Sequence, residues 1–215
     1  MHNSITNVVL VGLCGSGKSA IGRQLAGRLG FGFLDLDSWI EKSAGCPVAR
    51  IFSDGGESDF RKKESEALSE IGGITGHVIA LGGGTMQNSE NRGLISDLGV
   101  TVWINIPTQM IAYRLSRNTE ELKKRPLLAE IARETQESER AQALQSLLDR
   151  QLSERQEGFR EAHLTFSDGF VSPDDAALRI RQQLDGREFQ KSLRKRQKNK
   201  ERLREKRSSG HSEGE

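Results

Sequence analysis

The sequence has little cysteine and no long hydrophobic segment. Its two cysteines, Cys14 and Cys46, are too few for a disulfide framework and lack the spacing of a zinc site. The longest apolar runs, such as Val78 to Leu81, are far too short to cross a bilayer. The first residues also lack the basic and then apolar plan of a secretion signal. We therefore expect a protein of the reducing cytoplasm that neither spans a membrane nor is exported.

The charge is nearly balanced over the chain but unevenly distributed. The net charge is +2, whereas residues 187–207 carry eleven Lys or Arg and three Asp or Glu, so residues 1–186 come to −4. Residues 1–186 suffice for one domain with a sizeable core. Residues 187–215 have few large apolar residues, which predicts a basic tail that is disordered or partly helical. Such a tail could contact nucleic acid or an acidic partner, but its one aromatic, Phe189, offers no stacking platform, and composition favours a solvated extension.

Short apolar runs alternate with longer, helix-compatible stretches. The runs predict five strands, at Asn7–Val11, Phe33–Asp35, His77–Leu81, Thr101–Ile106 and His163–Phe166. Apolar spacing predicts helices at Ser19–Leu29, Asp59–Ile71 and Thr108–Ser116, a helical insertion at 128–160, and a last helix from Pro173 to Gly186. This alternation is typical of an α/β fold in which helices cover both faces of a parallel sheet.

The segment Gly12–Ser19 fits the phosphate-binding pattern G-x-x-x-x-G-K-[ST]. It follows the apolar stretch Val8–Val11 and opens a helical pattern, which is the context that the motif requires. The glycines let backbone N–H groups surround phosphates, Lys18 neutralises the outer oxygens, and the Ser19 hydroxyl can bind magnesium. The first ligand to expect is a nucleoside triphosphate. In such an enzyme the late helical insertion is where a mobile lid would lie.

The second predicted strand ends in the segment Asp35-Leu36-Asp37, which carries two carboxylates. Alternation along an extended chain would point both to the same side, at the sheet edge where ligands bind in open α/β folds. One could serve magnesium while the other faces an acceptor hydroxyl. The alternative is that they cap a helix starting at Ser38, but a cap needs only one Asp.

Three further features point to ligand contacts. Gly82, Gly83 and Gly84 follow an apolar strand directly, and their entropic cost indicates a backbone that lies close to a ligand. Arg125 stands before Pro126 at the start of the insertion, and Arg155 lies near its far end; arginines suit phosphoryl charge and carboxylates. Arg61 precedes Glu64 by three residues, a spacing that taken alone is typical of a surface ion pair.

Taken together, these motifs resemble the shikimate kinase family. The resemblance rests on Gly12–Ser19, Asp35-x-Asp37 followed by Ile40-Glu41, Phe60-Arg61-x-x-Glu64, Gly82–Gly84 and Arg125-Pro126-Leu127-Leu128, in this order over roughly residues 5–185. It implies the three-layer fold of nucleoside monophosphate kinases, with a five-stranded parallel sheet in the order 2-3-1-4-5 and a helical lid at about 122–160. The implied reaction transfers the γ-phosphoryl group of ATP to the 3-hydroxyl of shikimate, a step of aromatic amino acid biosynthesis.

The resemblance also implies roles for single residues. Asp37 would contact the reacting hydroxyl as candidate base, and Lys18 and Arg125 would complete the catalytic set. Ser19 and Asp35 would serve Mg²⁺. The shikimate contacts would be Asp37, Arg61, Gly82, Gly83, Gly84 and Arg155, beside an apolar wall of Phe52 and Phe60. The ATP contacts would be Gly15, Ser16, Gly17, Lys18, Ser19, Ala20, Arg117 and Arg125. We expect a monomer whose ligands are shikimate and ATP.

The chain departs from the family pattern in the insertion. Where family members commonly show Arg-x-Pro-x-Tyr, this sequence keeps Arg155 but has Glu157 and Phe159. Two other functions stay open at this stage. One is another small-molecule kinase such as a gluconate kinase. The other is a nucleotide-binding protein that lacks kinase activity and uses the basic tail on RNA or an acidic partner.

Overall fold

Five parallel strands form one sheet in the order β2-β3-β1-β4-β5. The computed structural model describes residues 5–123, 125–133 and 136–209. The strands are β1 (Asn7–Val11), β2 (Gly32–Asp35), β3 (His77–Ala80), β4 (Val100–Ile104) and β5 (Leu164–Phe166). Each overlaps a strand expected from the sequence, and the order of the sheet confirms the predicted fold class.

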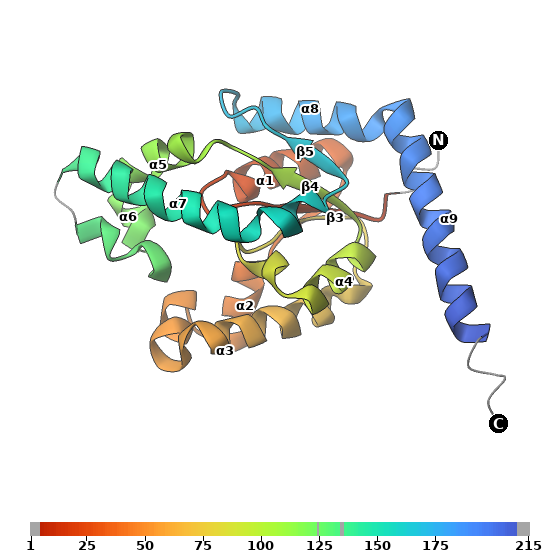
Figure 1. Cartoon of the computed structure of the whole chain (residues 1–215), viewed down its shortest axis with the longest axis horizontal. Helices are drawn as coiled ribbons and strands as arrows, with labels where there is room; N and C mark the ends of the chain where they lie inside the picture. Colours follow the sequence, from red (N-terminus) through yellow and green to blue (C-terminus); the bar gives the residue numbers. More distant parts are fainter. Residues whose placement is uncertain (1–4, 124, 134–135, 210–215) are drawn as a thin grey trace.

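Helices cover both faces of this sheet. In Figure 1, α1 and α8 lie on one side of it and α3 and α4 on the other. The described helices are α1 (Lys18–Leu29), α2 (Leu36–Ala44), α3 (Val48–Glu70), α4 (Ser89–Leu98), α5 (Thr108–Ser116), α6 (Thr119–Lys123), α7 (Glu137–Arg160), α8 (Pro173–Asp185) and α9 (Arg187–Ser209). In the described part of the chain, no helix combines the length and the apolar character that crossing a bilayer requires.

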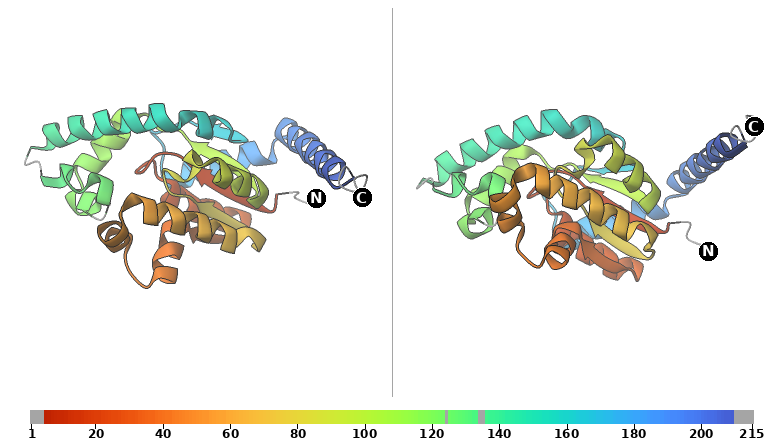
Figure 2. Two further views of the ribbon diagram at one scale, coloured as in Figure 1. Left: turned by 60° about the horizontal axis from the view of Figure 1, so that its bottom comes forward. Right: turned by 90° about the horizontal axis from the view of Figure 1, so that it is seen from below.

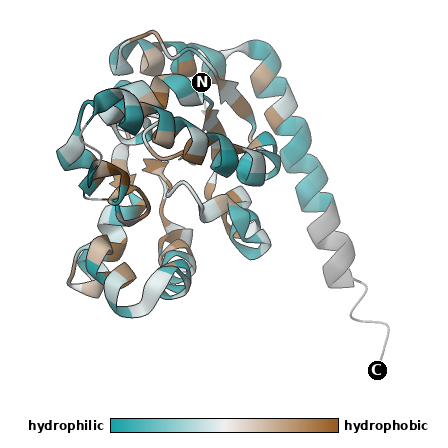
Figure 3. Cartoon of the chain, turned by 60° about the vertical axis from the view of Figure 1, so that its left-hand side comes forward, coloured by the Kyte–Doolittle hydropathy of each residue, from teal (hydrophilic) through white to brown (hydrophobic). Residues whose placement is uncertain are grey.

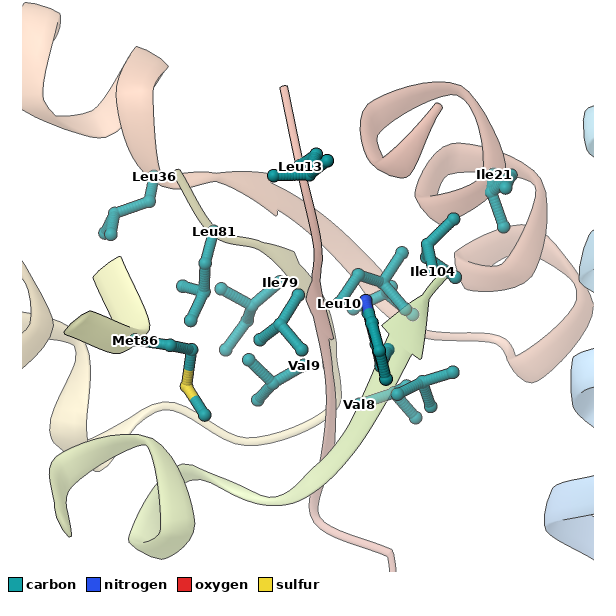
Figure 4. Close-up of a cluster of buried hydrophobic side chains, with 14 of the residues drawn as sticks. Val8, Val9, Leu10, Leu13, Ile21, Leu36, Ile79, Leu81, Met86 and Ile104 are labelled. Atoms are coloured by element: carbon teal, nitrogen blue, oxygen red, sulfur yellow. The ribbon is translucent and has the colours of Figure 1, made fainter. Parts of the chain in front are cut away.

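The core is formed around the two central strands. Every residue of β1 and β4 is buried, because helices pack on both faces of the sheet. Figure 4 shows Val8, Val9 and Leu10 of β1 among apolar side chains that include Ile79 and Ile104. These rigid strands fix the positions of the loops that leave their carboxyl ends.

The second strand ends at Asp35, as predicted, but the extended chain does not continue to Asp37. Helix α2 begins at Leu36, so Asp37 lies in the first turn of a helix and not on an extended chain. The cause is local: the Asp35 carboxylate accepts a hydrogen bond from the Ser38 backbone N–H and caps α2. Asp35 therefore caps α2 and also lies at the carboxyl end of β2, where ligands bind in open α/β folds.

Helix α3 is longer than the predicted helix at Asp59–Ile71, because it begins at Val48. Gly56 interrupts it with φ 72° and ψ −174°, a conformation that essentially only glycine adopts. The kink separates the first turns, which carry Phe52, from the part that carries Phe60 and Arg61.

The C-terminal segment is helical, which is one of the two forms expected for the basic tail. Residues 187–209 form helix α9, which projects from the body of the protein in Figures 1 and 2. Its start is anchored: Leu193 is buried, Phe189 packs on the core, and Gln190 Nε2 donates to the Leu184 carbonyl oxygen at 2.6 Å. The low content of apolar residues in this segment did not predict that Phe189 and Leu193 would pack against the body. Residues 210–215 of the predicted tail lie outside the described residues.

Candidate active site

Most of the predicted site residues line one cavity of about 620 Å³. The cavity lies at the carboxyl ends of the central strands, where loops leave a parallel sheet. The predicted residues on its wall are Gly15, Gly17, Lys18, Ser19, Ala20, Asp35, Asp37, Arg61, Gly82, Gly83, Gly84, Arg125 and Arg155. Segments far apart in the sequence therefore meet at one place.

The loop between β1 and α1 has the conformation of an anion-binding loop. Gly15 and Gly17 have φ values of 78° and 98°, in the left-handed region that favours glycine, and Gly17 is the N-cap of α1. The start of this helix presents backbone N–H groups and the positive end of its dipole. The loop can therefore hold phosphate oxygens.

Lys18 lies beneath this loop. Its ammonium donates hydrogen bonds of 2.8 Å to the carbonyl oxygens of Gly12 and Leu13. Burial lowers its pKa from 10.5 to about 8, and the carboxylate of Asp37 opposes that shift. A bound phosphate would favour the charged ammonium.

Ser19 and Asp35 are held together at the start of α1 and the end of β2. The Ser19 hydroxyl donates to Asp35 Oδ2 at 2.6 Å, and both residues line the cavity. A hydroxyl and a carboxylate are hard oxygen ligands of the kind that Mg²⁺ prefers, with water and phosphates completing its shell. The two residues fit a magnesium ion on this chemistry.

Asp37 projects from the first turn of α2 into the same cavity. Burial is the main cause that raises its pKa from 3.8 to about 6, and the neighbouring carboxylates of Asp35 and Glu64 raise it further. Lys18 and Arg125 act in the opposite direction. A carboxylate with a raised pKa suits proton abstraction near neutral pH.

The glycine run after β3 packs against charged side chains. A Cβ atom at Gly82 would lie 2.5 Å from Glu64 Oε1, and one at Gly84 would lie 2.5 Å from Arg61 Nη2. Only glycine leaves room for these contacts. The run therefore brings its backbone next to Arg61 and Glu64. Its predicted approach to a ligand stays a prediction.

Glu64 is a buried carboxylate, not the surface residue that its spacing favoured. It is 0% exposed, its Oε2 accepts from Arg61 Nη1 at 2.9 Å, and its Oε1 accepts from the Thr85 hydroxyl. Arg61 also donates to Glu57 at 2.9 Å. Burial disfavours the guanidinium charge, but Glu64 and Glu57 outweigh it and raise the pKa of Arg61.

Arg155 reaches the cavity from α7. The buried residues of this helix follow helical spacing and include Leu144, Leu148, Gln151 and Arg155. Arg155 Nη1 donates to the Gly83 carbonyl oxygen at 3.2 Å and to Gln151 Oε1 at 3.4 Å. Burial and the charge of Arg61 lower the pKa of Arg155. An anion between the two guanidiniums would relieve that repulsion.

Arg125 contacts the phosphate loop. Its Nη1 donates to Cys14 Sγ, and its Nη2 donates to Glu121 Oε1 at 2.7 Å. The guanidinium is thereby held beside the loop that carries Lys18.

Unsatisfied polar atoms concentrate on predicted site residues. In the described part of the chain, six buried side-chain nitrogen or oxygen atoms lack a hydrogen-bond partner, and four of them belong to Ser16, Asp37, Arg125 and Arg155. Each such atom costs free energy unless a ligand or water pairs with it. The atoms on these four residues are therefore available to pair with a ligand.

Two of the predicted site residues do not line the cavity. Ser16 is buried within the loop, and Arg117 lies at the end of α5, where Nη1 donates to the Tyr113 hydroxyl at 2.6 Å. Phe52 and Phe60 do line it, with ring centroids 4.9 Å apart.

Three further residues contribute to the site and were not expected from the sequence. Thr85 and Gln151 hold Glu64 and Arg155, and Cys14 meets Arg125. The signal for Gln151 was present, because a polar residue one turn before Arg155 on an apolar helix face is unusual. No sequence signal marked the other two, since their partners come from distant segments.

Comparisons with known proteins agree with this geometry. The family model "Shikimate kinase" matches residues 14–185. A shikimate kinase of Prochlorococcus marinus is 38% identical over 174 residues, which cover 81% of this chain and 83% of that protein. One of Nitratidesulfovibrio vulgaris is 41% identical over 120 residues, covering 56% of this chain and 69% of that protein.

The fold of this chain is also similar to that of a solved structure. The shikimate kinase of Acinetobacter baumannii in complex with shikimate has a TM-score of 0.74 to this structure and 32% sequence identity. The similarity covers 85% of this chain and 94% of that one. The family match extends over all the segments that form the cavity. On this evidence, the chain belongs to the shikimate kinase family.

Proposed function

We propose that this protein transfers the γ-phosphoryl group of ATP to the 3-hydroxyl of shikimate. The proposal rests on the side chains that line the cavity. They include Lys18 of the phosphate loop, the carboxylate of Asp37, and the guanidiniums of Arg61 and Arg155. Two guanidiniums suit a substrate carboxylate, and a base suits a hydroxyl. The proposal includes that the protein acts as a monomer.

Each of these residues has its own role in the phosphoryl transfer. Asp37 accepts the proton of the attacking hydroxyl, and Arg61 and Arg155 hold the carboxylate of shikimate so that this hydroxyl faces the triphosphate. Lys18 and Arg125 stabilise the charge that develops as the phosphoryl group leaves ADP. The Gly82–Gly84 backbone contacts the acceptor. Positioning and charge stabilisation, rather than covalent chemistry, carry the reaction.

Magnesium belongs to this proposal. Ser19 and Asp35 would hold it, directly or through water, as their 2.6 Å contact at the cavity wall suggests. The ion would neutralise phosphate charge.

The segment at about 122–160 would act as a lid. It includes η3 (Pro126–Leu128), η4 (Ile131–Arg133) and α7, while residues 124, 134 and 135 lie outside the described residues. Arg125 and Arg155 lie near its two ends, so its closure would complete the site and exclude water, which competes with shikimate as acceptor. Arg117, two residues beyond the cavity-lining Leu115, would contact the adenine. A reducing compartment such as the cytoplasm suits the two free thiols.

A coupled assay of ADP release tests the proposal, with shikimate, gluconate or no acceptor added to the full chain. We expect turnover with shikimate, little with gluconate and slow hydrolysis alone. Arg61→Ala should raise the Michaelis constant for shikimate at least tenfold, because the carboxylate loses one of its two partners. The matched control is Arg50→Ala on the same helix, whose side chain is 70% exposed. Turnover that does not depend on shikimate would contradict the assignment.

A further inference from the structure

Helix α9 has two chemically different sides. One side faces the body through Phe189, Leu193 and Lys200, where Lys200 Nζ donates to Ser96 Oγ at 3.2 Å. The other side is exposed and carries a row of cations, the basic stripe, which consists of Lys191, Arg194, Lys195, Lys198 and Arg202. Asn199 and one acidic residue, Glu201, lie beside the stripe. The positions of the stripe recur with the period of a helix, so the five charges share one face over about 17 Å.

The basic stripe has little internal neutralisation. Lys191 pairs with Glu188 at 2.9 Å, on side chains that are 73% and 87% exposed. The structure records no ion pair for the other four cations within the described residues. Such an exposed row of like charges disfavours the folded helix unless an anion meets it. Residues 1–186 have a net charge of −4, so the excess positive charge of the chain lies in the segment that forms this helix.

We propose that the basic stripe binds the phosphate backbone of double-helical DNA without reading its sequence. The stripe has no apolar residue that could enter a bilayer and no aromatic or apolar anchor of the kind that forms the core of a protein interface. It also lacks the aromatic platform that single strands use. Figure 3 shows the described part of α9 as mostly hydrophilic along its length.

The shape of the helix favours B-form DNA over an RNA duplex. Figures 1 and 2 show α9 as a straight rod, and its contacts with the body leave the side of the basic stripe open. The B-form major groove is about 12 Å wide and admits an α-helix, whereas the A-form groove of RNA is too narrow for side chains to enter. Cations along the rod can then meet phosphates that border the groove.

Binding at the stripe would leave the catalytic cavity free. The α9 residues that touch the body adjoin Thr6, Gly99, Val100 and His163, which lie at the amino ends of the strands. The catalytic cavity is at their carboxyl ends. DNA contact and kinase activity should therefore be separable.

Fluorescence anisotropy with a labelled DNA duplex of about 20 base pairs tests this inference on the full chain. We expect micromolar affinity at low salt and a log–log salt slope of about −4.5, since five neutralised phosphates give roughly −0.9 each. The stripe variant replaces all five cations by Gln, a good helix former. It should bind at least tenfold more weakly with a flatter slope, yet keep full kinase turnover.

A matched control variant removes the same number of charges elsewhere, at the exposed residues Lys42, Lys62, Arg133, Arg150 and Arg160. It should bind DNA within about twofold of the parent if the stripe carries the affinity. Equal loss in both variants, or none in the stripe variant, would overturn the proposal. So would tighter binding to an RNA duplex of the same sequence, to polyglutamate or to vesicles of anionic phospholipid.

Discussion

At the scale of single residues, the environment of Asp37 links catalysis to stability. Burial holds the carboxyl pKa at about 6, above its ordinary value of 3.8. Between about pH 4 and pH 6, Asp37 is protonated in the folded state and ionised in the unfolded state. The free energy of unfolding therefore falls as pH rises through this range, and it stays lowered above pH 6. The same shift makes the ionised carboxylate a better base at neutral pH.

Asp37→Asn separates these two effects. We expect at least a hundredfold loss of turnover with near-normal ATP affinity, because the amide cannot accept the hydroxyl proton. The variant should also be more stable than the parent by roughly 2 kcal/mol at pH 8, with the gap closing near pH 4. Urea unfolding at several pH values and the coupled assay measure both. A gap that does not change with pH, or wild-type turnover, would remove Asp37 from this role.

The pH–rate profile of the parent should be bell-shaped. Turnover should rise through pH 6 as Asp37 loses its proton. Activity at limiting ATP should fall above pH 8 as the ammonium of Lys18 loses its charge, because burial lowers its pKa to about 8. In Asp37→Asn the acid limb should disappear while the basic limb stays. An unchanged acid limb in the variant would assign that limb to another group.

Gly84→Ala tests the close approach of backbone to guanidinium. The added Cβ would meet Arg61 Nη2 at 2.5 Å, while Gly84 itself has φ −107°, which alanine tolerates. The flexible end of Arg61 should move, raising the Michaelis constant for shikimate at least tenfold with a small change in Tm. Gly93→Ala, in α4 with no atom within 4 Å of the new Cβ, is the control and should leave the constant unchanged. Equal constants in both variants would contradict the role of the glycine run.

At the scale of elements, the kink in α3 positions one wall of the cavity. Apolar spacing predicted the second half of this helix but not its first turns, because Gly55 and Gly56 lower helix propensity. In the structure, packing of Ile51 in the core retains those turns, and Gly56 supplies the bend. Phe52 can then meet Phe60 across the kink.

Gly56→Ala should distort this bend, because its φ of 72° and ψ of −174° exclude ordinary side chains. We expect a loss of about 1–3 kcal/mol in stability and a raised Michaelis constant for shikimate, with that for ATP unchanged. Gly45→Ala is the matched control, since Gly45 also has positive φ, 68°, but ends α2. It should lower the stability alone. A change in both Michaelis constants for Gly56→Ala would indicate a more general distortion.

At the scale of the whole molecule, the C-terminal helix α9 is attached at the amino ends of the strands. The catalytic cavity lies at their carboxyl ends. Leu193, 4% exposed, and the Lys200–Asp97 ion pair hold α9 to the body. The family match ends at residue 185, just before this helix. Residues 1–186 are therefore expected to form the kinase domain.

Truncation after residue 186 should leave turnover and both Michaelis constants unchanged. It should lower the Tm by several degrees, since burial of Leu193 contributes about 1.5–3 kcal/mol. Thermal unfolding and the coupled assay measure these effects. A tenfold fall in turnover of a chain that still unfolds cooperatively would show that α9 contributes to the site.

The sequence by itself determined the approximate positions of the strands and the phosphate loop, because these follow from local periodicity and from a motif of fixed spacing. Its resemblance to a family implied the order of the strands in the sheet. Lys18 and Ser19 could be placed from such a motif alone. Only the tertiary structure decided that Glu64 is buried beneath the glycine run, that Asp37 lies on a helix, that Arg117 lies outside the cavity and that the tail is a helix. The reason is physical: burial, pKa and partner choice depend on segments tens of residues apart, and their packing has no signature within a local stretch of sequence.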